Sequence, residues 1–369
     1  MTAVVGVFTC PKKMEYGPCG GVGFDGCCEV SDHRCVFVDA PTVRWPGVAG
    51  DGRMPGEPAP SQGVAAANAG AEAMRAVIAE RQIVVADFPA RALDAASIAE
   101  CAALLAGEVD AVLAGDSGAE RVQFSPTYRA ALIQSQGLAV WSGLNCRDRN
   151  RVAIEGELAG LADVGVGGVH CVTGDHTLTG SRPDALPVFD LDSTRVAALA
   201  RAAGHLVSVG DSPATPPVGE RAARLVEKER AGAEIAFVNH AGGVEPVASF
   251  IRDVRRHEEA AGLRVRGTGG LGFVGCVPVV VDRGSAELLA TFTTLVLPEG
   301  YLERILGARD VYAEGVAAAI EFSQGLLELS GMIGVNLSGG ATPGREGHFA
   351  DALARISAGI GVRQRPARG

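Results

Sequence analysis

The side chains best suited to chemistry follow short apolar segments, where β-strands are expected to end. Residues 145–150 (Asn-Cys-Arg-Asp-Arg-Asn) follow one such segment, and Thr173-Gly174-Asp175-His176 follows another, Gly168–Val172. An alanine-rich helical pattern lies between the two, which is typical of a β-α-β unit. In parallel sheets functional groups lie beyond the carboxyl ends of the strands. We therefore expect Asp175 to lie in a binding site.

The same alternation of apolar and amphipathic segments continues from residue 82 to about residue 340. The segments expected to form strands are 82–88, 109–114, 138–144, 168–172, 205–209, 235–238, 277–281 and 333–337. Eight strand-helix units over roughly 290 residues favour a (β/α)8 TIM barrel of the α/β class. A doubly wound sheet also alternates, but the G-x-G-x-x-G spacing of residues 267–272 leads into a proline-containing apolar segment and not into a helix.

A barrel would bring the polar residues at its strand ends to one rim. These residues are Asp87, Asp116, Asn145, Thr173, Asp175, His176, Asp211, Ser212, Asn239, His240, Asn336 and Ser338. The rim has carboxylates and amides but no reactive serine paired with a base, which disfavours a hydrolytic triad. Asp175 can stabilise a developing cation or accept N–H bonds from a heteroaromatic ring, or it can simply cap a helix. His170 and His205 lie within expected strands and are assigned to the core.

Five of the nine cysteines fall within the first 35 residues. They are Cys10, Cys19, Cys27, Cys28 and Cys35, and they stand among glycines and prolines. Disulfides do not persist in a reducing compartment, so clustered thiols there indicate metal ligands in preference to disulfides. We predict a zinc ion or an iron-sulfur cluster on Cys10, Cys19, Cys35 and one of Cys27 or Cys28. Reduced cysteines that bind no metal are the alternative.

Composition excludes several classes of function. The net charge is -10 and no Lys/Arg stripe is evident, so neither nucleic acid nor an anionic membrane is an expected partner. No apolar segment approaches the roughly 20 residues of a membrane span, and the first ten residues lack the features of a signal peptide. We expect a cytoplasmic protein with a metal-binding module (1–40), a linker and leading helix (41–81) and a barrel (82–369).

Several of these segments resemble the methylenetetrahydrofolate reductase family. They are residues 146–151, 172–175, 188–193, 232–239 and 275–278, in the order that the family has them. The amino-terminal pattern of cysteines is similar to the cysteine-rich module that accompanies some of these reductases as a carboxy-terminal domain or as a partner subunit. In this chain the module precedes the barrel.

The resemblance implies an oxidoreductase that converts 5,10-methylenetetrahydrofolate to 5-methyltetrahydrofolate, usually with FAD relaying hydride from NAD(P)H. Asp175 would stabilise the cationic methylene-iminium form of the folate, and Asp87 would deliver the ring-opening proton. Asn239 would bind folate, with His176 beside it, and Asp190 would contact the flavin's sugar-phosphate portion. Asn145 and Thr173 are assigned to the cofactor side.

Two departures from the family keep alternatives open. Asp87 and Asn239 stand where the family has a glutamate and a glutamine, and the expected flavin-lining residues are absent at Gly143 and in residues 210–212. The reductase hypothesis therefore leaves three sources of electrons open: NAD(P)H with flavin, NAD(P)H without flavin, or a redox centre in the module. A folate-dependent one-carbon transferase and a non-catalytic partner subunit are the other hypotheses. A redox partner or a homo-oligomer is compatible with each.

Overall fold

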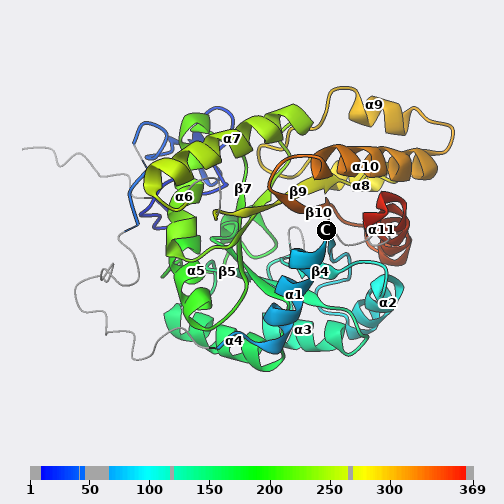
Figure 1. Ribbon diagram of the computed structural model, residues 1–369, viewed down its shortest axis with the longest axis horizontal. Helices are drawn as coiled ribbons and strands as arrows, with labels where there is room; N and C mark the ends of the chain where they lie inside the picture. The colour runs from blue at the N-terminus through cyan, green and yellow to red at the C-terminus, as the bar shows by residue number, and fades with distance from the viewer. Residues whose placement is uncertain (1–9, 41, 46–65, 117–119, 265–268, 363–369) are drawn as a thin grey trace, which may run out of the picture.

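The computed structural model describes residues 10–40, 42–45, 66–116, 120–264 and 269–362, and its centre is a closed barrel of eight parallel strands (Figure 1). Around the barrel the strand order is β10-β3-β4-β5-β6-β7-β8-β9. The bounds are β3 Ile83–Asp87, β4 Ala111–Ala114, β5 Val140–Asn145, β6 Gly168–Val172, β7 Val207–Asp211, β8 Ile235–Val238, β9 Gly272–Pro278 and β10 Met332–Ser338. The predicted (β/α)8 barrel is confirmed.

One strand lies about five residues from its predicted place. Residues 277–281 were expected to form the seventh barrel strand, whereas β9 begins at Gly272 and ends at Pro278. Two glycines interrupt the apolar pattern of this strand in the sequence. Apolar side chains from neighbouring elements fill the space beside them instead. A Cβ on Gly272 would lie 2.8 Å from Ile333, and one on Gly275 would lie 2.9 Å from Leu326.

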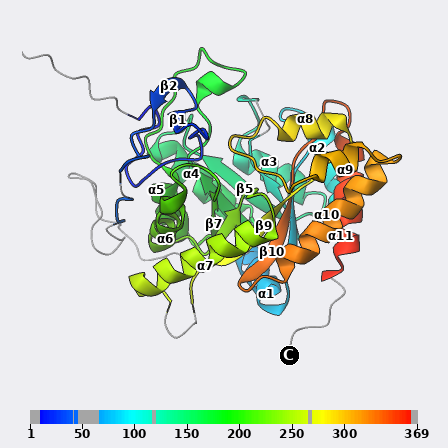
Figure 2. The same ribbon diagram turned by 90° about the horizontal axis from the view of Figure 1, so that it is seen from above.

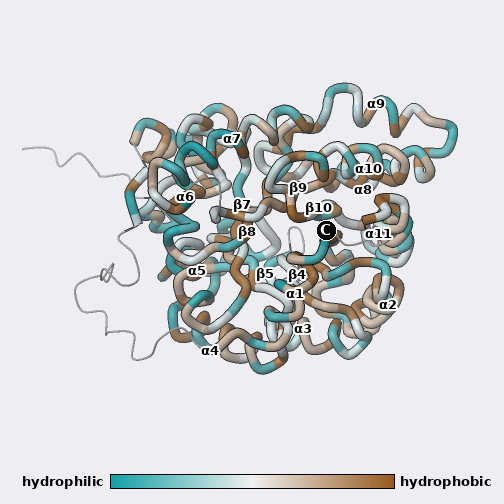
Figure 3. The backbone as a smooth tube through the Cα atoms, viewed as in Figure 1, coloured by the Kyte–Doolittle hydropathy of each residue, from teal (hydrophilic) through white to brown (hydrophobic). Residues whose placement is uncertain are grey.

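Helices surround the barrel, and apolar side chains face one another across the two layers. The helices are α1 Ala69–Glu80, α2 Ala95–Leu105, α3 Pro126–Gln134, α4 Arg151–Asp163, α5 Ser193–Ala202, α6 Arg221–Ala231, α7 Val244–Ala261, α8 Arg283–Leu289, α9 Tyr301–Leu306, α10 Val311–Leu327 and α11 Glu346–Ile360, with short 3-10 turns η1 Thr177–Thr179 and η2 Val218–Glu220. Figure 3 shows hydrophobic residues along the central strands and hydrophilic ones on the outer side of α7 and α11. None of the described helices is long and apolar enough to cross a membrane.

The interior of the barrel is filled at one end only. Side chains that alternate along the strands point inward, and Ile83, Trp141 and Phe237 form a buried cluster there. The Trp141 ring takes the space beside Gly168, where a Cβ would lie 2.5 Å from it. This packing closes the floor, so a ligand can enter only from the carboxyl ends of the strands.

The cysteine-rich module lies over the mouth of the barrel, beside α5 and α6 (Figure 2). Its two short antiparallel strands are β1 Cys27–Cys28 and β2 Ser31–Arg34. The part of the predicted linker that is described, residues 42–45, packs against α6 because Trp45 contacts Tyr16 and Ala231. Most of that predicted linker, residues 46–65, lies outside the described residues.

A buried carboxyl pair between α6 and α7 predicts a pH-dependent stability. Burial and the nearby Glu258 raise the pKa of Glu229 to about 8 from its ordinary 4.5. The folded state therefore keeps a proton that the unfolded state releases, and stability falls as pH rises between these values. We expect Glu229→Gln to raise the free energy of unfolding above pH 8 by at least about 1.4 kcal/mol, the equivalent of one pKa unit.

Urea unfolding at about pH 5 and above pH 8 tests this expectation, with the gain confined to the higher pH. Glu72→Gln on the exposed face of α1 serves as the control and should change neither value. An equal effect of Glu229→Gln at both pH values would contradict the assignment.

Candidate functional site

A cavity of about 1030 Å³ opens at the carboxyl ends of the barrel strands. Its walls come from the strand ends of the barrel on one side and from the cysteine-rich module on the other. The residues predicted to act on substrate or cofactor that line it are Asp87, Asn145, Thr173, Asp175 and Asn239. Other predicted rim residues and the predicted metal ligands Cys19, Cys27 and Cys28 line it as well. His176 and Asp190 are not among its lining residues. The barrel therefore brings together side chains that are as much as 152 positions apart in the chain, from Asp87 to Asn239.

Asp87 lies at the end of β3 on the polar floor of the cavity. Its Oδ1 accepts a hydrogen bond from Asn336 Nδ2 at 2.8 Å, and its Oδ2 accepts one from the backbone N–H of Gly339 at 3.0 Å. Burial raises the pKa of Asp87, although these bonds oppose the shift. A carboxyl group with a raised pKa is suited to donate a proton near neutral pH.

Asn239 lines the same cavity as Asp87 and is held by two neighbours. Its Nδ2 donates to Ser212 Oγ at 3.0 Å, and its Oδ1 accepts from the Cys276 thiol at 3.4 Å. Cys276, on β9, was not predicted as a site residue because it lies inside a strand and the register of that strand was misplaced. The Asn336 Oδ1 atom is buried without a hydrogen-bond partner among the described residues. A ligand N–H is the kind of group that would satisfy it.

Two histidines and a lysine also line the polar part of the cavity. His240 lines the cavity as predicted, and burial lowers its pKa to about 4. His170 is buried as predicted, yet it also lines the cavity, where burial and the charge of Lys228 lower its pKa to about 3. Lys228 reaches in from α6 and donates to the Gly210 carbonyl at 2.7 Å. A helix residue gives no strand-end signal, so the sequence did not indicate Lys228.

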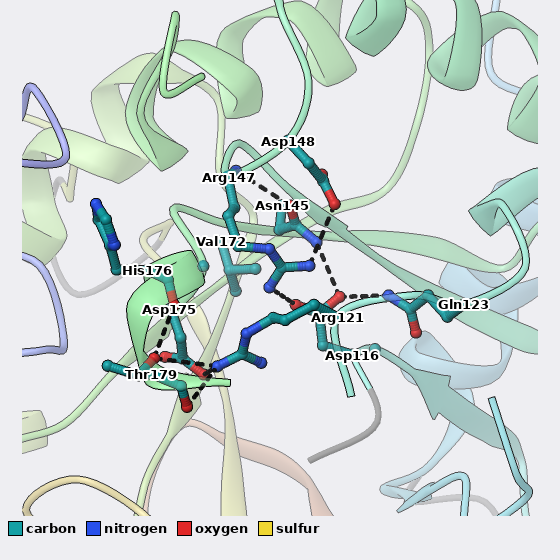
Figure 4. Close-up of polar contacts among 12 residues, drawn as sticks. Asp116, Arg121, Gln123, Asn145, Arg147, Asp148, Val172, Asp175, His176 and Thr179 are labelled. Carbon is teal, nitrogen blue, oxygen red and sulfur yellow. Dashed lines mark hydrogen bonds and ion pairs between the residues drawn. The ribbon is translucent and has the colours of Figure 1, made fainter. Parts of the chain in front are cut away.

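Asp175 lies at the rim of the cavity, next to Arg121 (Figure 4). Its side chain is 62% exposed, and Arg121 Nη2 lies 3.8 Å from its Oδ2. The side chain is open to the cavity, but the protein around it withholds part of its hydration, and this raises the pKa of Asp175. Glu29 and Asp116 add to the shift, and Lys12 and Arg121 oppose it. The exposed carboxylate is open to a ligand in the cavity.

The loop after β5 is held by its own network of hydrogen bonds. Asn145 Nδ2 donates to Asp116 Oδ1 at 2.8 Å, and Asn145 Oδ1 accepts from the backbone N–H of Arg147 at 3.1 Å. Arg147 is fully buried and lies 2.7 Å from Asp116 Oδ2. Figure 4 shows this network next to Arg121. The amide of Asn145 is thus engaged by the protein.

The remaining predicted residues also have partners within the protein. Thr173 Oγ1 accepts from the backbone N–H of Ser193 at 3.2 Å, and Asp190 Oδ2 accepts from that of Arg151 at the start of α4 at 2.9 Å. His176 Nδ1 accepts from the Leu178 N–H, and its ring stacks on Phe189. In Figure 4 the ring of His176 points away from Asp116.

Four of the five clustered cysteines are linked by their charges, although in the described residues they are not gathered into a metal site. Burial raises the pKa values of Cys10 and Cys35, and Cys19 and Cys28 add to both shifts. Cys27 instead donates to the Asp32 carbonyl at 3.8 Å. This arrangement favours Cys28 over Cys27 as the fourth ligand of the predicted centre. Within the described residues, no three His, Cys, Asp or Glu side chains stand close enough to hold a metal ion.

The fold and the site define a TIM-barrel protein whose mouth carries carboxylates and amides beneath a cysteine-rich module. Residues 1–43 match the family model described as "Methylene-tetrahydrofolate reductase C terminal". The resemblance predicted for the module is confirmed by this match. A comparison with curated proteins found no match.

Solved structures are similar to this chain to different degrees, and only the first named below supports the shared barrel fold. One is a protein from Clostridium thermocellum described as binding two copies of 5-methyl-5,6,7,8-tetrahydrofolic acid, with a TM-score of 0.56 and 14% identity over 77% of this chain and 99% of that one. Another is the carboxyl transferase domain of Rhizobium etli pyruvate carboxylase, with a TM-score of 0.44 and 14% identity over 83% of this chain and 52% of that one. At these identities the likeness concerns the fold alone.

Proposed function

We propose that the cavity binds a reduced folate and that the chain reduces 5,10-methylenetetrahydrofolate to 5-methyltetrahydrofolate. The observation that carries the proposal is the meeting of Asp87, Asn239 and Asp175 in one cavity, next to the unpartnered Asn336 amide oxygen. A pterin presents N–H donors and ring acceptors along one edge, which suits a floor of carboxylate and amide groups. The matched module and the folate-binding barrel from Clostridium thermocellum support the same ligand class.

Each carboxylate has a separate task in this proposal. Opening the five-membered ring breaks the bond from the methylene carbon to N10, and N10 takes the proton that Asp87 holds. The carboxylate of Asp175 lies at the rim, where it stabilises the N5 methylene-iminium cation. Hydride from NAD(P)H then reaches the methylene carbon, so that the folate gains a methyl group and NAD(P)H becomes NAD(P)⁺.

FAD does not fit the residues that the resemblance assigned to it. Asn145 and Thr173 already bond within the protein, and Asp190 caps α4 outside the cavity. The module also covers this side, since Lys12 Nζ donates to the Gly174 carbonyl at 2.8 Å. We therefore derive no step through flavin and propose direct hydride transfer. A cavity of about 1030 Å³ lies at the upper end of the usual range for ligand sites, about 300–1,000 Å³, which leaves room for two ring systems.

For the module we propose a metal centre, either zinc or an iron-sulfur cluster, on Cys10, Cys19, Cys28 and Cys35. The charges of Cys19 and Cys28 raise the pKa values of both Cys10 and Cys35, which supports the set, and binding of the metal would draw the four thiols together. Thiolates are the ligands that both centres prefer. Because such free thiols persist in a reducing compartment, we also propose a cytoplasmic location.

A one-carbon transferase is the second candidate. Both oxygens of Asp87 already accept hydrogen bonds, from Asn336 and Gly339, which favours a structural carboxylate over a proton donor. In that case the folate binds, but no hydride moves and the carbon passes to another acceptor.

Anaerobic assays of the purified chain separate these functions. We expect oxidation of NADH or NADPH that depends on 5,10-methylenetetrahydrofolate, formation of 5-methyltetrahydrofolate, and no flavin absorbance in the active protein. Calorimetry should show binding of 5-methyltetrahydrofolate. Folate binding without hydride transfer would replace the reductase by the transferase, and a chain that binds no folate would end both proposals.

A further inference from the structure

The cysteine-rich module forms a wall of the ligand cavity. Its lining residues include Lys12, Met14, Cys19, Gly21 and Glu29, which lie opposite the strand ends of the barrel. Figure 2 shows β1 and β2 of the module beside the segment that follows β6. Without the module, the cavity would lack this entire side.

Polar contacts fix the module at the loop that carries Asp175. Lys12 Nζ donates to the Gly174 carbonyl at 2.8 Å, and the backbone N–H of His176 donates to Glu29 Oε1 at 2.8 Å. The residues on both sides of Asp175 are therefore bound to the module. A shift of the module would move the Asp175 carboxylate with it.

Lys12 lies between the cysteine cluster and Asp175. Its side chain is 4% exposed and its Nζ lies 2.7 Å from Glu29 Oε1. The same Nζ donates to the Gly174 carbonyl at 2.8 Å, so one buried ammonium group joins the module to the loop that carries Asp175. Glu29 in turn packs on Gly21, where a Cβ would lie 2.0 Å from Glu29 Oε2. The pair is thus held in place by the turn that follows Cys19.

We propose that Lys12 is a positioning residue of the folate site, and that it couples occupancy of the cavity to the state of the cysteine cluster. This inference rests on the proposed folate binding. Lys12 holds the loop 174–176 through Gly174 and Glu29, and Glu29 packs on Gly21, whose backbone N–H donates to Cys19 Sγ at 3.3 Å. Coupling between two sites is reciprocal, so a ligand in the cavity must also change the cluster.

The first test compares two neighbouring lysines in the full-length chain, with 5-methyltetrahydrofolate as the probe in calorimetry. We expect Lys12→Met to weaken binding about tenfold or more, because it leaves Glu29 unpaired beside Asp175. Lys13→Met is the matched control, since Lys13 also donates to a barrel carbonyl, that of Val188 at 2.9 Å, but does not line the cavity. Lys12→Arg keeps the charge and should recover part of the affinity.

The second test needs no substitution and also covers the case that Lys12→Met fails to fold. The rate at which dithionitrobenzoate modifies the module cysteines is measured with and without 5-methyltetrahydrofolate. Peptide mass spectrometry separates them from the buried Cys101, Cys146, Cys171 and Cys276. We expect the ligand to change the rates at Cys10 and Cys35, which do not line the cavity, by about fivefold or more, the usual lower range of coupling between sites.

The outcomes distinguish the proposed role of Lys12 from the proposed folate binding on which it rests. A wild-type chain that binds no folate removes both. Folate binding with unchanged thiol rates, or with equal affinity in a folded Lys12→Met variant, removes the role of Lys12 and leaves the proposed function standing.

Discussion

Asp87→Asn is expected to lower the turnover of 5,10-methylenetetrahydrofolate by about 10²- to 10⁴-fold, the usual contribution of a general acid. Asparagine keeps the size of the side chain and can accept one of the two hydrogen bonds from Asn336 and Gly339, but its amide has no acidic proton to give to N10. The affinity for 5-methyltetrahydrofolate should change far less, because that product has already received the proton. Steady-state kinetics and calorimetry on the same preparation measure the two effects.

The pH dependence of turnover tests the proton-donor role of Asp87 independently. Burial raises the pKa of Asp87, so the protonated acid persists to higher pH than in an exposed aspartate. Turnover should fall as pH rises through that pKa, and the fall should vanish in the residual activity of Asp87→Asn. Asp190→Asn, whose carboxylate lies outside the cavity lining, is the control. Full turnover in Asp87→Asn would remove the proton-donor role of Asp87, assign it a structural task and leave the reductase to find its proton elsewhere.

Cys28→Ser is expected to remove the metal from the module, whereas Cys27→Ser is expected to keep it. The two residues are adjacent in β1, but of the two only Cys28 acts by its charge on the pKa values of Cys10 and Cys35. Structural zinc in small domains contributes an apparent binding free energy of about 10–16 kcal/mol, so the loss of one ligand should also destabilise the module. Elemental analysis of protein purified without chelator gives the metal content, and thermal unfolding reports the stability.

Comparing the metal content of Cys28→Ser and Cys27→Ser tests the ligand set directly, because the two variants have the same composition. Equal metal content in both would contradict the four-cysteine set, and wild-type protein without zinc or iron would remove the metal proposal altogether. Loss of metal in Cys27→Ser alone would move the centre toward Asp25 and Asp32, which lie near that thiol.

Local sequence patterns predicted the barrel because each strand is a short apolar segment with its own end. β6 and β8 have the bounds expected from the sequence, and Asp87 and Asp175 stand at strand ends as predicted. β9 was misplaced because the packing of Ile333 and Leu326 on its glycines is a tertiary property. The local sequence does not indicate which side chains will pack against a glycine.

The sequence by itself determined the fold class, the polar rim and the cysteine-rich module, since periodicity and strand-end residues are local features. Only the tertiary structure placed Lys12, Lys228 and Cys276 in the cavity, turned His176 toward Phe189 and separated Cys28 from Cys27. These outcomes depend on side chains meeting across hundreds of residues. Such meetings are decided by the closure of the barrel and the docking of the module, which spacing along the chain does not encode.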